Sequence, residues 1–497
     1  MALSGKNLIA GQWVTNDEQN TFSAYLPATD DLGKIQFYNV SSEQVNTAVE
    51  AAQLAFPRYR RISAAERASF LQTIAESIMS LGDELLQITH METGLSVERL
   101  RGERQRTINQ LNAFSVELLN PSYTDIEEPG DETRSPVPKP STKLTRIPLG
   151  PVAVFGASNF PYAFSTLGGD TVAALAAGCP VVVKAHPAHP GTSELMALAI
   201  HHAIDKLAIP KGVFSQFHST DPVLAHQLVR HSGIKAVGFT GSQKVAELLI
   251  KSIQLRSDSI PFYGELGSIN PQFVFSEKIK HGSGALAQQL CLSLLMGNGQ
   301  FCTSPGVWIV PESATDFIET CSTFMSEQYS DTLLTKGIQK EYESSVSALK
   351  MNKQLRNIAN AKQLQHFHGT PSLFATNAYH FVTNEQLRKE VFGPCAVIVT
   401  YKQIEELQQI VSVMEGQLTA SVHGTERDFE EHKDLIESIS FKVGRLIYNQ
   451  MPTGVEVCAS MNHGGPYPAS TDIRSTSVGQ QAMSRFLRPL CIQNFSE

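Results

Sequence analysis

The spacing of apolar residues predicts helices in the first part of the chain. Up to about residue 100, apolar side chains recur every three or four positions, which is the period of an amphipathic helix. We therefore expect this part to be mainly helical, with helices at 41–56, 64–80 and 83–93.

A different pattern begins near residue 150, where short apolar runs alternate with amphipathic segments. The predicted strands are 152–155, 181–184, 213–217, 235–239 and 262–266, and the predicted helices are 165–177, 192–207, 222–231 and 243–253. Strands separated by helices of this length are typical of βαβ units, which form a parallel sheet covered on both faces. A predicted helix at 285–297 and strands at 307–310, 396–401 and 445–448 indicate a second α/β region.

Between these regions, residues 125–148 change in composition from an acidic run to a proline-rich stretch. Four prolines exclude a continuous helix there. We interpret this stretch as a linker and an extended arm.

Composition narrows the class of protein. The 497 residues are 42% apolar and 18% charged, which is typical of a globular protein. A net charge of −8 argues against nucleic acid as the main partner. We expect no membrane span, because the most apolar stretch ends at Lys184 after too few residues. We expect no signal peptide, because the N-terminus lacks a charged region followed by a sustained apolar run. Seven scattered cysteines without a CxxC pair predict reduced thiols in the cytoplasm.

Three residues are candidates for chemistry. Cys302 in GNGQFCTSPG lies in a polar loop where backbone amides favour a reactive thiolate, although a structural cysteine is the alternative. Glu265 ends an apolar strand, where burial would raise its pKa toward that of a general base, or where a structural contact would satisfy it. Asn159 in FGASNFPYAF could donate to an oxyanion or close a turn.

Three further segments could bind an anion or a nucleotide. Lys184 ends a buried strand, the place where open parallel sheets meet ligands. Residues 240–242 connect a strand to a helix, so free amides and a hydroxyl lie at a helix N-terminus. No GxGxxG motif is present, and Glu390 in KEVFGP has no specific meaning by itself.

In order along the chain, NLIAGQW, SNFPYAF, KAHP, GFTGS, GELG, GQFCTSPG and EVFGP together resemble the aldehyde dehydrogenase superfamily over nearly the whole length. The resemblance implies an α/β fold with a Rossmann-type cofactor domain, a second α/β catalytic domain and an oligomerisation arm. It places the dinucleotide-binding domain at 1–135 and 149–264, the catalytic domain at 265–470, and the arm at 136–148 and 471–497. A homodimer or homotetramer assembled through this arm is the implied assembly.

The resemblance also implies a mechanism without a metal. Cys302 would attack a small aldehyde to give a thiohemiacetal and then a thioester, Asn159 would hold the oxyanion, and Glu265 would activate water. The implied cofactor-binding residues are Lys184, Thr240, Gly241, Ser242, Gly267, Glu390 and Phe392.

The segment HGGPYPASTDIRSTSVG departs from the usual family pattern and is similar to the branch of 2-oxoglutarate semialdehyde (2,5-dioxopentanoate) dehydrogenases, which also includes NADP-linked fatty aldehyde dehydrogenases. We expect 2,5-dioxopentanoate as substrate, with Arg474 or Arg445 pairing with its carboxylate. Pro187 stands where NAD-specific relatives have a glutamate, so NADP should be accepted and preferred, with NAD also used. His186 and His189 should keep this region neutral to positive.

Other readings remain open. A fatty aldehyde is the alternative substrate. A non-redox thiol acyltransferase or hydrolase would need a histidine beside the thiol, and no histidine lies near Cys302 in sequence, although one could approach in space. Asn159, Glu265 and Cys302 together argue against a catalytically silent relative.

Overall fold

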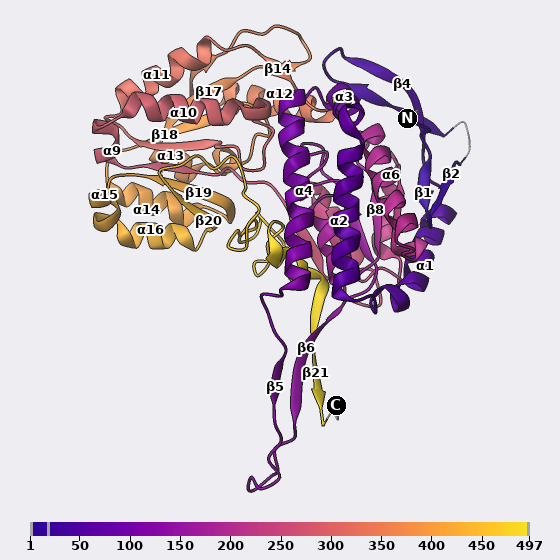
Figure 1. Cartoon of the computed structure of the whole chain (residues 1–497). Coiled ribbons are helices and arrows are strands. Elements are labelled where there is room, and N and C mark those ends of the chain that lie inside the picture. Colours follow the sequence, from indigo (N-terminus) through magenta and orange to yellow (C-terminus); the bar gives the residue numbers. More distant parts are fainter. Residues whose placement is uncertain (1–2, 17–19, 495–497) are drawn as a thin grey trace.

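Two seven-stranded sheets and a projecting three-stranded sheet organise the chain in this computed structural model, which describes residues 3–16 and 20–494 (Figure 1). The α-helices are α1 (Ser42–Tyr59), α2 (Ala64–Ser80), α3 (Gly82–Thr93), α4 (Val97–Leu119), α5 (Gly169–Ala177), α6 (Pro190–Lys206), α7 (Pro222–Arg230), α8 (Gln243–Ile253), α9 (Ser276–Lys280), α10 (Ser283–Leu295), α11 (Thr315–Ser326), α12 (Lys336–Met351), α13 (Ala378–Thr383), α14 (Ile404–Val413), α15 (Glu426–Glu431) and α16 (Lys433–Ser440). Short 3₁₀ helices are η1 (Lys211–Val213), η2 (Met296–Gly299), η3 (Glu385–Arg388) and η4 (Gln480–Phe486).

The strands complete the element list. They are β1 (Asn7–Ile9), β2 (Gln12–Val14), β3 (Thr21–Leu26), β4 (Asp31–Tyr38), β5 (Ile126–Glu128), β6 (Thr142–Pro148), β7 (Val152–Phe155), β8 (Val181–Lys184), β9 (Phe214–Phe217), β10 (Ala236–Thr240), β11 (Phe262–Glu265), β12 (Gln272–Val274), β13 (Val307–Pro311), β14 (Asp331–Thr332), β15 (Arg356–Asn360), β16 (His368–Gly369), β17 (Ser372–Asn377), β18 (Cys395–Tyr401), β19 (Gln417–His423), β20 (Val443–Tyr448) and β21 (Leu487–Gln493).

The first sheet has the order β11-β10-β7-β8-β9-β1-β2, and its five strands from β7 to β11 are parallel. The chain moves outward from β7 through β8 and β9, then returns to add β10 and β11 on the other side of β7. The strand order therefore reverses between β7 and β10, and in such sheets ligands bind beyond the carboxyl ends of the strands at this point. The predicted βαβ arrangement of this region is confirmed.

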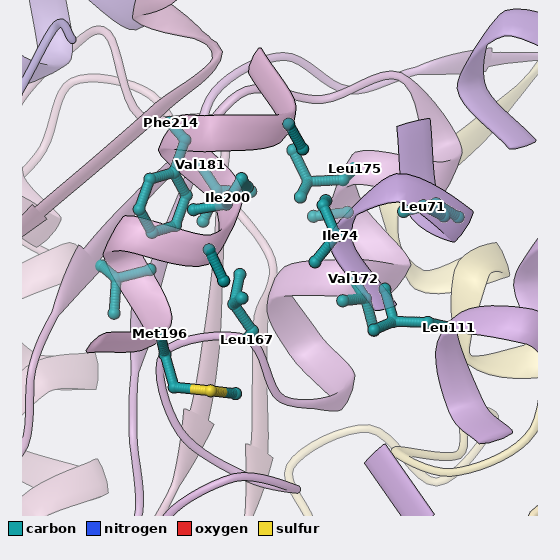
Figure 2. Packing of buried hydrophobic residues seen from close by; sticks show 14 of the residues in the cluster. Leu71, Ile74, Leu111, Leu167, Val172, Leu175, Val181, Met196, Ile200 and Phe214 are labelled. Carbon is teal, nitrogen blue, oxygen red and sulfur yellow. The ribbon is translucent and has the colours of Figure 1, made fainter. Parts of the chain in front are cut away.

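Helices from the N-terminal part pack on this sheet (Figure 1). Leu71 of α2 and Leu111 of α4 share one buried cluster with Val172 and Leu175 of α5 and Val181 of β8 (Figure 2). Because these side chains have almost no exposed surface, α2 and α4 are held firmly against the layer that covers the strands. This packing brings α4 close to the loop that follows β7. Across the described ranges, no helix has both the length and the apolar character needed to cross a membrane.

The expectation that the first hundred residues are mainly helical was only partly correct. Strands β1 to β4 occupy much of the first 38 residues. β1 adds to the first sheet through an antiparallel contact between Leu8 and Gln216 of β9. A strand of three residues shows no periodicity of its own, so its pairing with a strand 200 residues away carries no local signal.

The second sheet has the order β15-β17-β18-β13-β12-β19-β20, and all its neighbours are parallel except β15 and β17. Its five inner strands are buried, and helices α10 and α11 pack together on one side with Trp308 and Phe317 in their core. The chain leaves α10 through η2 and then enters the loop that carries Cys302. The predicted second α/β region is thus present.

The arm consists of β5, β6 and β21, with β21 antiparallel to β6 from Leu487 opposite Pro148 to Gln493 opposite Thr142. It projects from the body of the molecule (Figure 1). Residues 471–486 were also expected in the arm, but they are not part of it. Ala482, Met483 and Phe486 are buried in the main core, because these apolar side chains cover α5. The domain boundaries as a whole remain a prediction.

Candidate active site

One cavity of about 560 Å³ gathers the residues that the sequence singled out. It lies beyond the carboxyl ends of β7, β8, β10 and β11, which are neighbours in the first sheet. Ten lining residues were predicted from sequence motifs: Asn159, Lys184, Thr240, Gly241, Ser242, Glu265, Gly267, Cys302, Glu390 and Phe392. Because parallel strands end at the same edge, motifs far apart in sequence converge at this edge.

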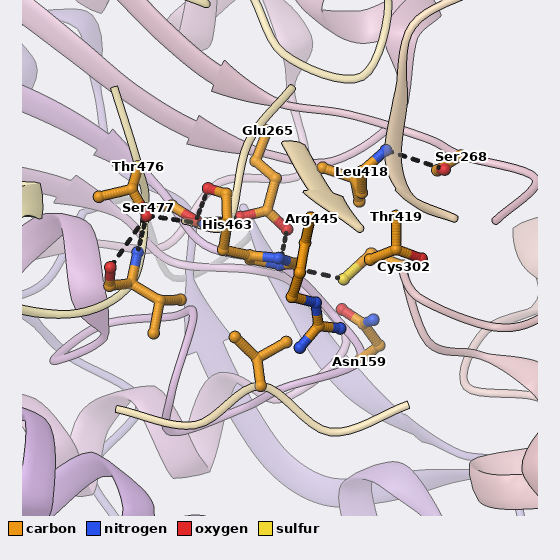
Figure 3. A network of polar contacts seen from close by, with 12 residues as sticks. Asn159, Glu265, Ser268, Cys302, Leu418, Thr419, Arg445, His463, Thr476 and Ser477 are labelled. Atoms are coloured by element: carbon orange, nitrogen blue, oxygen red, sulfur yellow. Dashed lines mark hydrogen bonds and ion pairs between the residues drawn. The ribbon is translucent and has the colours of Figure 1, made fainter. Parts of the chain in front are cut away.

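Cys302 faces a histidine and a carboxylate. Its Sγ lies 3.5 Å from Nε2 of His463, and the same ring nitrogen lies 2.8 Å from Oε1 of Glu265 (Figure 3). These side chains each contribute one atom to a group whose members all lie within 4.8 Å of one another. A nucleophile with a base beside it, and a carboxylate that holds the base, is an arrangement suited to activating a thiol.

His463 was not predicted, and it lies 161 residues after Cys302. Its backbone N–H donates to Oγ1 of Thr476 over 2.8 Å, and Ser477 donates hydrogen bonds both to Glu265 and to the carbonyl oxygen of His463. The segment 463–477 therefore closes the site as one hydrogen-bonded unit. A thiol acyltransferase or hydrolase would need a histidine beside Cys302, and His463 meets this requirement. The sequence signal for His463 was the segment HGGPYPASTDIRSTSVG, which begins with this histidine and departs from the usual family pattern.

Electrostatics set the resting protonation of this group. Burial raises the pKa of the Cys302 thiol, and the charge of Glu265 raises it further. Burial would also raise the pKa of Glu265, but the opposing effects of His463, Ser477 and Cys302 leave it below its usual value. The expected upward shift of the Glu265 pKa was therefore wrong, because His463 offsets the cost of burial. The thiol is protonated at neutral pH and needs a base before it can attack.

Asn159 is fixed from both of its ends. Its side-chain Nδ2 donates to the carbonyl oxygen of Gln300 over 3.0 Å, and its own carbonyl accepts a 2.7 Å hydrogen bond from Nη2 of Arg99. An amide nitrogen has two hydrogens, so one remains for an oxygen near Cys302.

Asn270 holds the loop that carries the thiol. Its Nδ2 donates to the carbonyl oxygens of Cys302 at 2.8 Å and Ser304 at 2.9 Å, and its Oδ1 accepts from Thr419. The sequence analysis missed this residue, because GSINPQ carries no motif for a contact made across two elements.

The rest of the cavity wall, from Glu390 near the thiol to Lys184, suits a dinucleotide. Burial lowers the pKa of Lys184 to about 8. Ser242 caps α8, accepting from the N–H of Val245, so the N-terminal amides of α8 face the cavity edge. A Cβ on Gly267 would lie 2.2 Å from Oε2 of Glu390, so only glycine lets this carboxyl approach the backbone.

Comparison with known proteins decides the family. The profile described as the aldehyde dehydrogenase family matches residues 13–488. The chain is 39% identical to alpha-ketoglutaric semialdehyde dehydrogenase 2 of Azospirillum brasilense, covering 100% of this chain and 95% of that protein. It is 38% identical to alpha-ketoglutaric semialdehyde dehydrogenase of Acinetobacter baylyi, covering 99% and 94% of the two chains.

The chain belongs to the aldehyde dehydrogenase family. The predicted enzyme class, an NAD(P)-dependent aldehyde dehydrogenase, is confirmed by this family membership.

Solved structures agree with the fold of this aldehyde dehydrogenase. Aldehyde dehydrogenase C of Pseudomonas syringae, solved as a mutant with NAD+ and octanal, is 19% identical with a TM-score of 0.83, covering 99% of this chain and 97% of that one. Aldehyde dehydrogenase 21 of Physcomitrella patens, solved with succinate, is 18% identical with a TM-score of 0.83, covering 98% of each chain. The predicted fold class is confirmed.

The charge around Lys184 differs from the expectation. Burial lowers the pKa of both His186 and His189, so these stacked rings are neutral at physiological pH. Asp221, which caps α7, lines the same end of the cavity. The aldehyde dehydrogenase therefore has one buried cation and one carboxylate here, and Pro187 contributes no charge.

The two arginines proposed for a substrate carboxylate are in different positions. Arg474 is 87% exposed and pairs with Asp472 at 3.3 Å. Arg445 lies beside Cys302 and Asn159 in the catalytic centre (Figure 3). Only Arg445 is thus placed to meet a substrate of this aldehyde dehydrogenase.

Proposed function

We propose that this protein oxidises 2,5-dioxopentanoate to 2-oxoglutarate. The observation that carries the proposal is the full-length similarity to two proteins named alpha-ketoglutaric semialdehyde dehydrogenase. The cavity supports it, because the three reacting side chains and the residues suited to a dinucleotide line one continuous space.

The reaction begins with activation of the thiol. Nε2 of His463 takes the proton of Cys302 while the hydrogen that this nitrogen directs at Oε1 of Glu265, 2.8 Å away, passes to the carboxylate. The thiolate then attacks the aldehyde carbon and forms a thiohemiacetal on Cys302. The oxyanion accepts hydrogen bonds from Nδ2 of Asn159 and from the backbone N–H of Cys302. Loss of one such donor would cost about 3–4 kcal/mol of transition-state stabilisation.

The residues at the far end of the cavity would hold NAD(P). Lys184 would bind the adenosine ribose, Thr240, Gly241 and Ser242 the pyrophosphate, and Glu390, Phe392 and Gly267 the nicotinamide end. When bound, the dinucleotide supplies the two-electron acceptor for the bound thiohemiacetal.

The thioester on Cys302 is then hydrolysed by water. Glu265, ionised again after it has released the first proton to solvent, accepts a proton from this water, and His463 gives a proton to the leaving thiolate and regains one from Glu265. The pair therefore acts in both halves of the reaction.

A substrate panel tests the proposal. Initial rates of absorbance at 340 nm would be measured with 2,5-dioxopentanoate, glutarate semialdehyde, glycolaldehyde and decanal, each with NAD and NADP. We expect the highest kcat/KM with 2,5-dioxopentanoate. A clear preference for decanal would support the fatty aldehyde alternative instead.

A second activity is favoured by the contact between Cys302 and His463. A thiol with an adjacent imidazole can cleave esters and thioesters without an electron acceptor. Hydrolysis of 4-nitrophenyl acetate without NAD(P) would measure it. The hydrolase becomes the main function only if this rate exceeds the dehydrogenase rate.

The cofactor preference and the assembly stay proposals. NADP should be preferred, with NAD also accepted, because Pro187 places no carboxylate beside the adenosine ribose. The edge strands β5 and β21 of the arm would pair with a second copy to give a homodimer or homotetramer. Light scattering that returned a monomer of 54.4 kDa at micromolar concentration would contradict this. The cytoplasmic location stays a prediction.

A further inference from the structure

One face of α4 supports the catalytic centre through three charged residues. Arg99, Glu103 and Arg106 are spaced by four and three positions, so they share this face. Arg99 donates to the carbonyl oxygen of Asn159, and Oε1 of Glu103 accepts from the backbone N–H groups of Tyr162 and Ala163. Arg99 and Glu103 thus hold the loop that follows β7.

Arg106 makes fewer hydrogen bonds than its guanidinium donors allow. Its guanidinium lies 5.3 Å from the ring centre of Phe164, and its Nε donates to the carbonyl oxygen of Val455 over 3.1 Å. Its Nη2 is buried and has no hydrogen-bond partner among the described residues. A buried guanidinium nitrogen without an acceptor is unfavourable, and such groups are normally paired.

Arg445 of β20 binds the same short segment, residues 452–455, whose Val455 carbonyl Arg106 contacts. Its Nη1 donates to the carbonyl oxygen of Gly454 at 3.0 Å and its Nη2 to that of Pro452 at 2.6 Å. Its Nε is also buried without a partner in the part of the chain that the structure describes. The guanidinium points toward Asn159 and Cys302 (Figure 3).

Both cations act on the thiol. The positive charge of Arg106 opposes the upward shift of the Cys302 pKa, and the charge of Cys302 raises the pKa of Arg445, which burial lowers. Glu103 attracts Arg106 most strongly, but the two make no ion pair within contact distance among the described residues. Arg445 lies beside the thiol (Figure 3), and Arg106 is near enough for its charge to act on it. Each guanidinium has one buried N–H without a partner among the described residues.

Apolar side chains lie beside Arg106. Phe160, Val455, Val457 and Met461 pack around Phe164 in one small cluster. Phe160 and Phe164 also line the cavity that contains Cys302. An aldehyde bound there would contact apolar side chains with its methylene groups and present a charged end to the arginines beside them.

We propose that Arg106 and Arg445 together bind the remote carboxylate of the aldehyde substrate and thereby select for oxo-acids over uncharged aldehydes. The inference rests on the proposed function, because it assumes a substrate with a carboxylate. In 2,5-dioxopentanoate the carboxylate is four bonds from the aldehyde carbon, so both ends of the molecule can be held at once. A guanidinium N–H to a carboxylate is a strong, charge-assisted hydrogen bond.

The test compares two substrates of equal carbon number, 2,5-dioxopentanoate and pentanal, with the wild type, Arg106→Gln and Arg445→Gln. We expect each variant to lose about 100-fold in kcat/KM for 2,5-dioxopentanoate, mainly through KM, and at most about tenfold for pentanal, through kcat, because a charge that favours the thiolate is lost for both substrates. Arg474→Gln is the matched control, because this arginine is exposed and distant from the thiol, and it should keep the wild-type ratio.

Equal losses for both substrates in either variant would show that the arginines only hold residues 452–455 or tune the thiol, and this would overturn the inference. An unchanged substrate ratio would overturn it as well. If Arg106→Gln does not fold, Arg106→Lys keeps the charge and the stem while losing the fork geometry, and it should still lose at least about fivefold on 2,5-dioxopentanoate alone.

Inhibition by glutarate separates this inference from the proposed substrate. Glutarate should compete with pentanal in the wild type and about tenfold less well in Arg445→Gln or Arg106→Lys. A wild type that prefers pentanal would refute 2,5-dioxopentanoate as substrate, yet arginine-dependent inhibition by glutarate would still support a carboxylate site. Inhibition that is absent, or equal in all variants, would overturn the inference.

Discussion

The two ends of the active-site cavity are assembled in different ways. At the dinucleotide end, Lys184 and Ser242 each follow their own strand within two residues, so a local strand–loop motif already places them. At the catalytic end, Cys302 and Glu265 meet His463 and Ser477, which arrive on a C-terminal segment without regular strands.

This difference has a consequence for function. The dinucleotide end can be recognised from short motifs, because its geometry depends on the edge of one parallel sheet. The catalytic end depends on contacts between both sheets and the segment 463–477, so its acid–base chemistry is a tertiary property. Mutations at the two ends should therefore separate cofactor binding from chemistry.

The largest effect is expected for Cys302→Ala. Removing the sulfur removes the covalent intermediate, so turnover should fall to background, while NADP binding measured by titration calorimetry should stay within about threefold of the wild type. A loss of binding equal to the loss of turnover would mean that the two ends are not separable.

Glu265→Gln should separate the two halves of the reaction. The thioester can still form, more slowly because the carboxylate that receives a proton from His463 is lost, whereas hydrolysis loses its base altogether. Stopped-flow absorbance at 340 nm should show a burst of about one equivalent followed by a steady rate about 1,000-fold below that of the wild type. A normal steady rate would remove Glu265 from the mechanism.

His463→Asn should slow formation of the thioester itself. Without an imidazole beside the thiol, Cys302 has no base at 3.5 Å, and the burst rate should fall by about 100-fold. The rate should recover as pH rises, because hydroxide then generates the thiolate. A burst rate that is unchanged at pH 7 would show that the contact is structural. Ser460→Ala, three residues before His463 and outside the network, is the control.

Pro187→Glu addresses the cofactor end alone. A carboxylate beside the adenosine ribose would repel a 2′-phosphate by about 1–4 kcal/mol, so kcat/KM for NADP should fall at least about tenfold while that for NAD changes little. Equal use of NADP by the variant and the wild type would show that Pro187 does not face the phosphate.

The smallest effect concerns the pH dependence of cofactor capture. The pKa of Lys184 in the free enzyme is about 8 because burial disfavours the charged amine. The amine is therefore charged below pH 8 and neutral above it, and kcat/KM for NADP should fall a few-fold between about pH 8 and 9. In Lys184→Arg the guanidinium stays charged, so the ratio of variant to wild type should rise over that range. A flat ratio would contradict the proposed role of Lys184.

The sequence by itself determined the class of fold and most of the cavity. The runs VAVF and VVVK form β7 and β8 with the expected bounds, because a strand buried on both faces must be apolar throughout. The ten motif residues line one cavity because each motif follows such a strand or packs against its end. The sequence alone could not locate β1, whose partner β9 lies about 200 residues away.

The tertiary structure decided the protonation chemistry of the site. Only the folded chain brings His463 to within 3.5 Å of Cys302 and 2.8 Å of Glu265, and the contacts of Glu265 with His463, Ser477 and Cys302 lower its pKa when burial alone would raise it. It also decided that Arg445, and not Arg474, adjoins the thiol. Local patterns report which surfaces must be buried, whereas electrostatic interactions depend on distances between side chains that meet only after both sheets have packed.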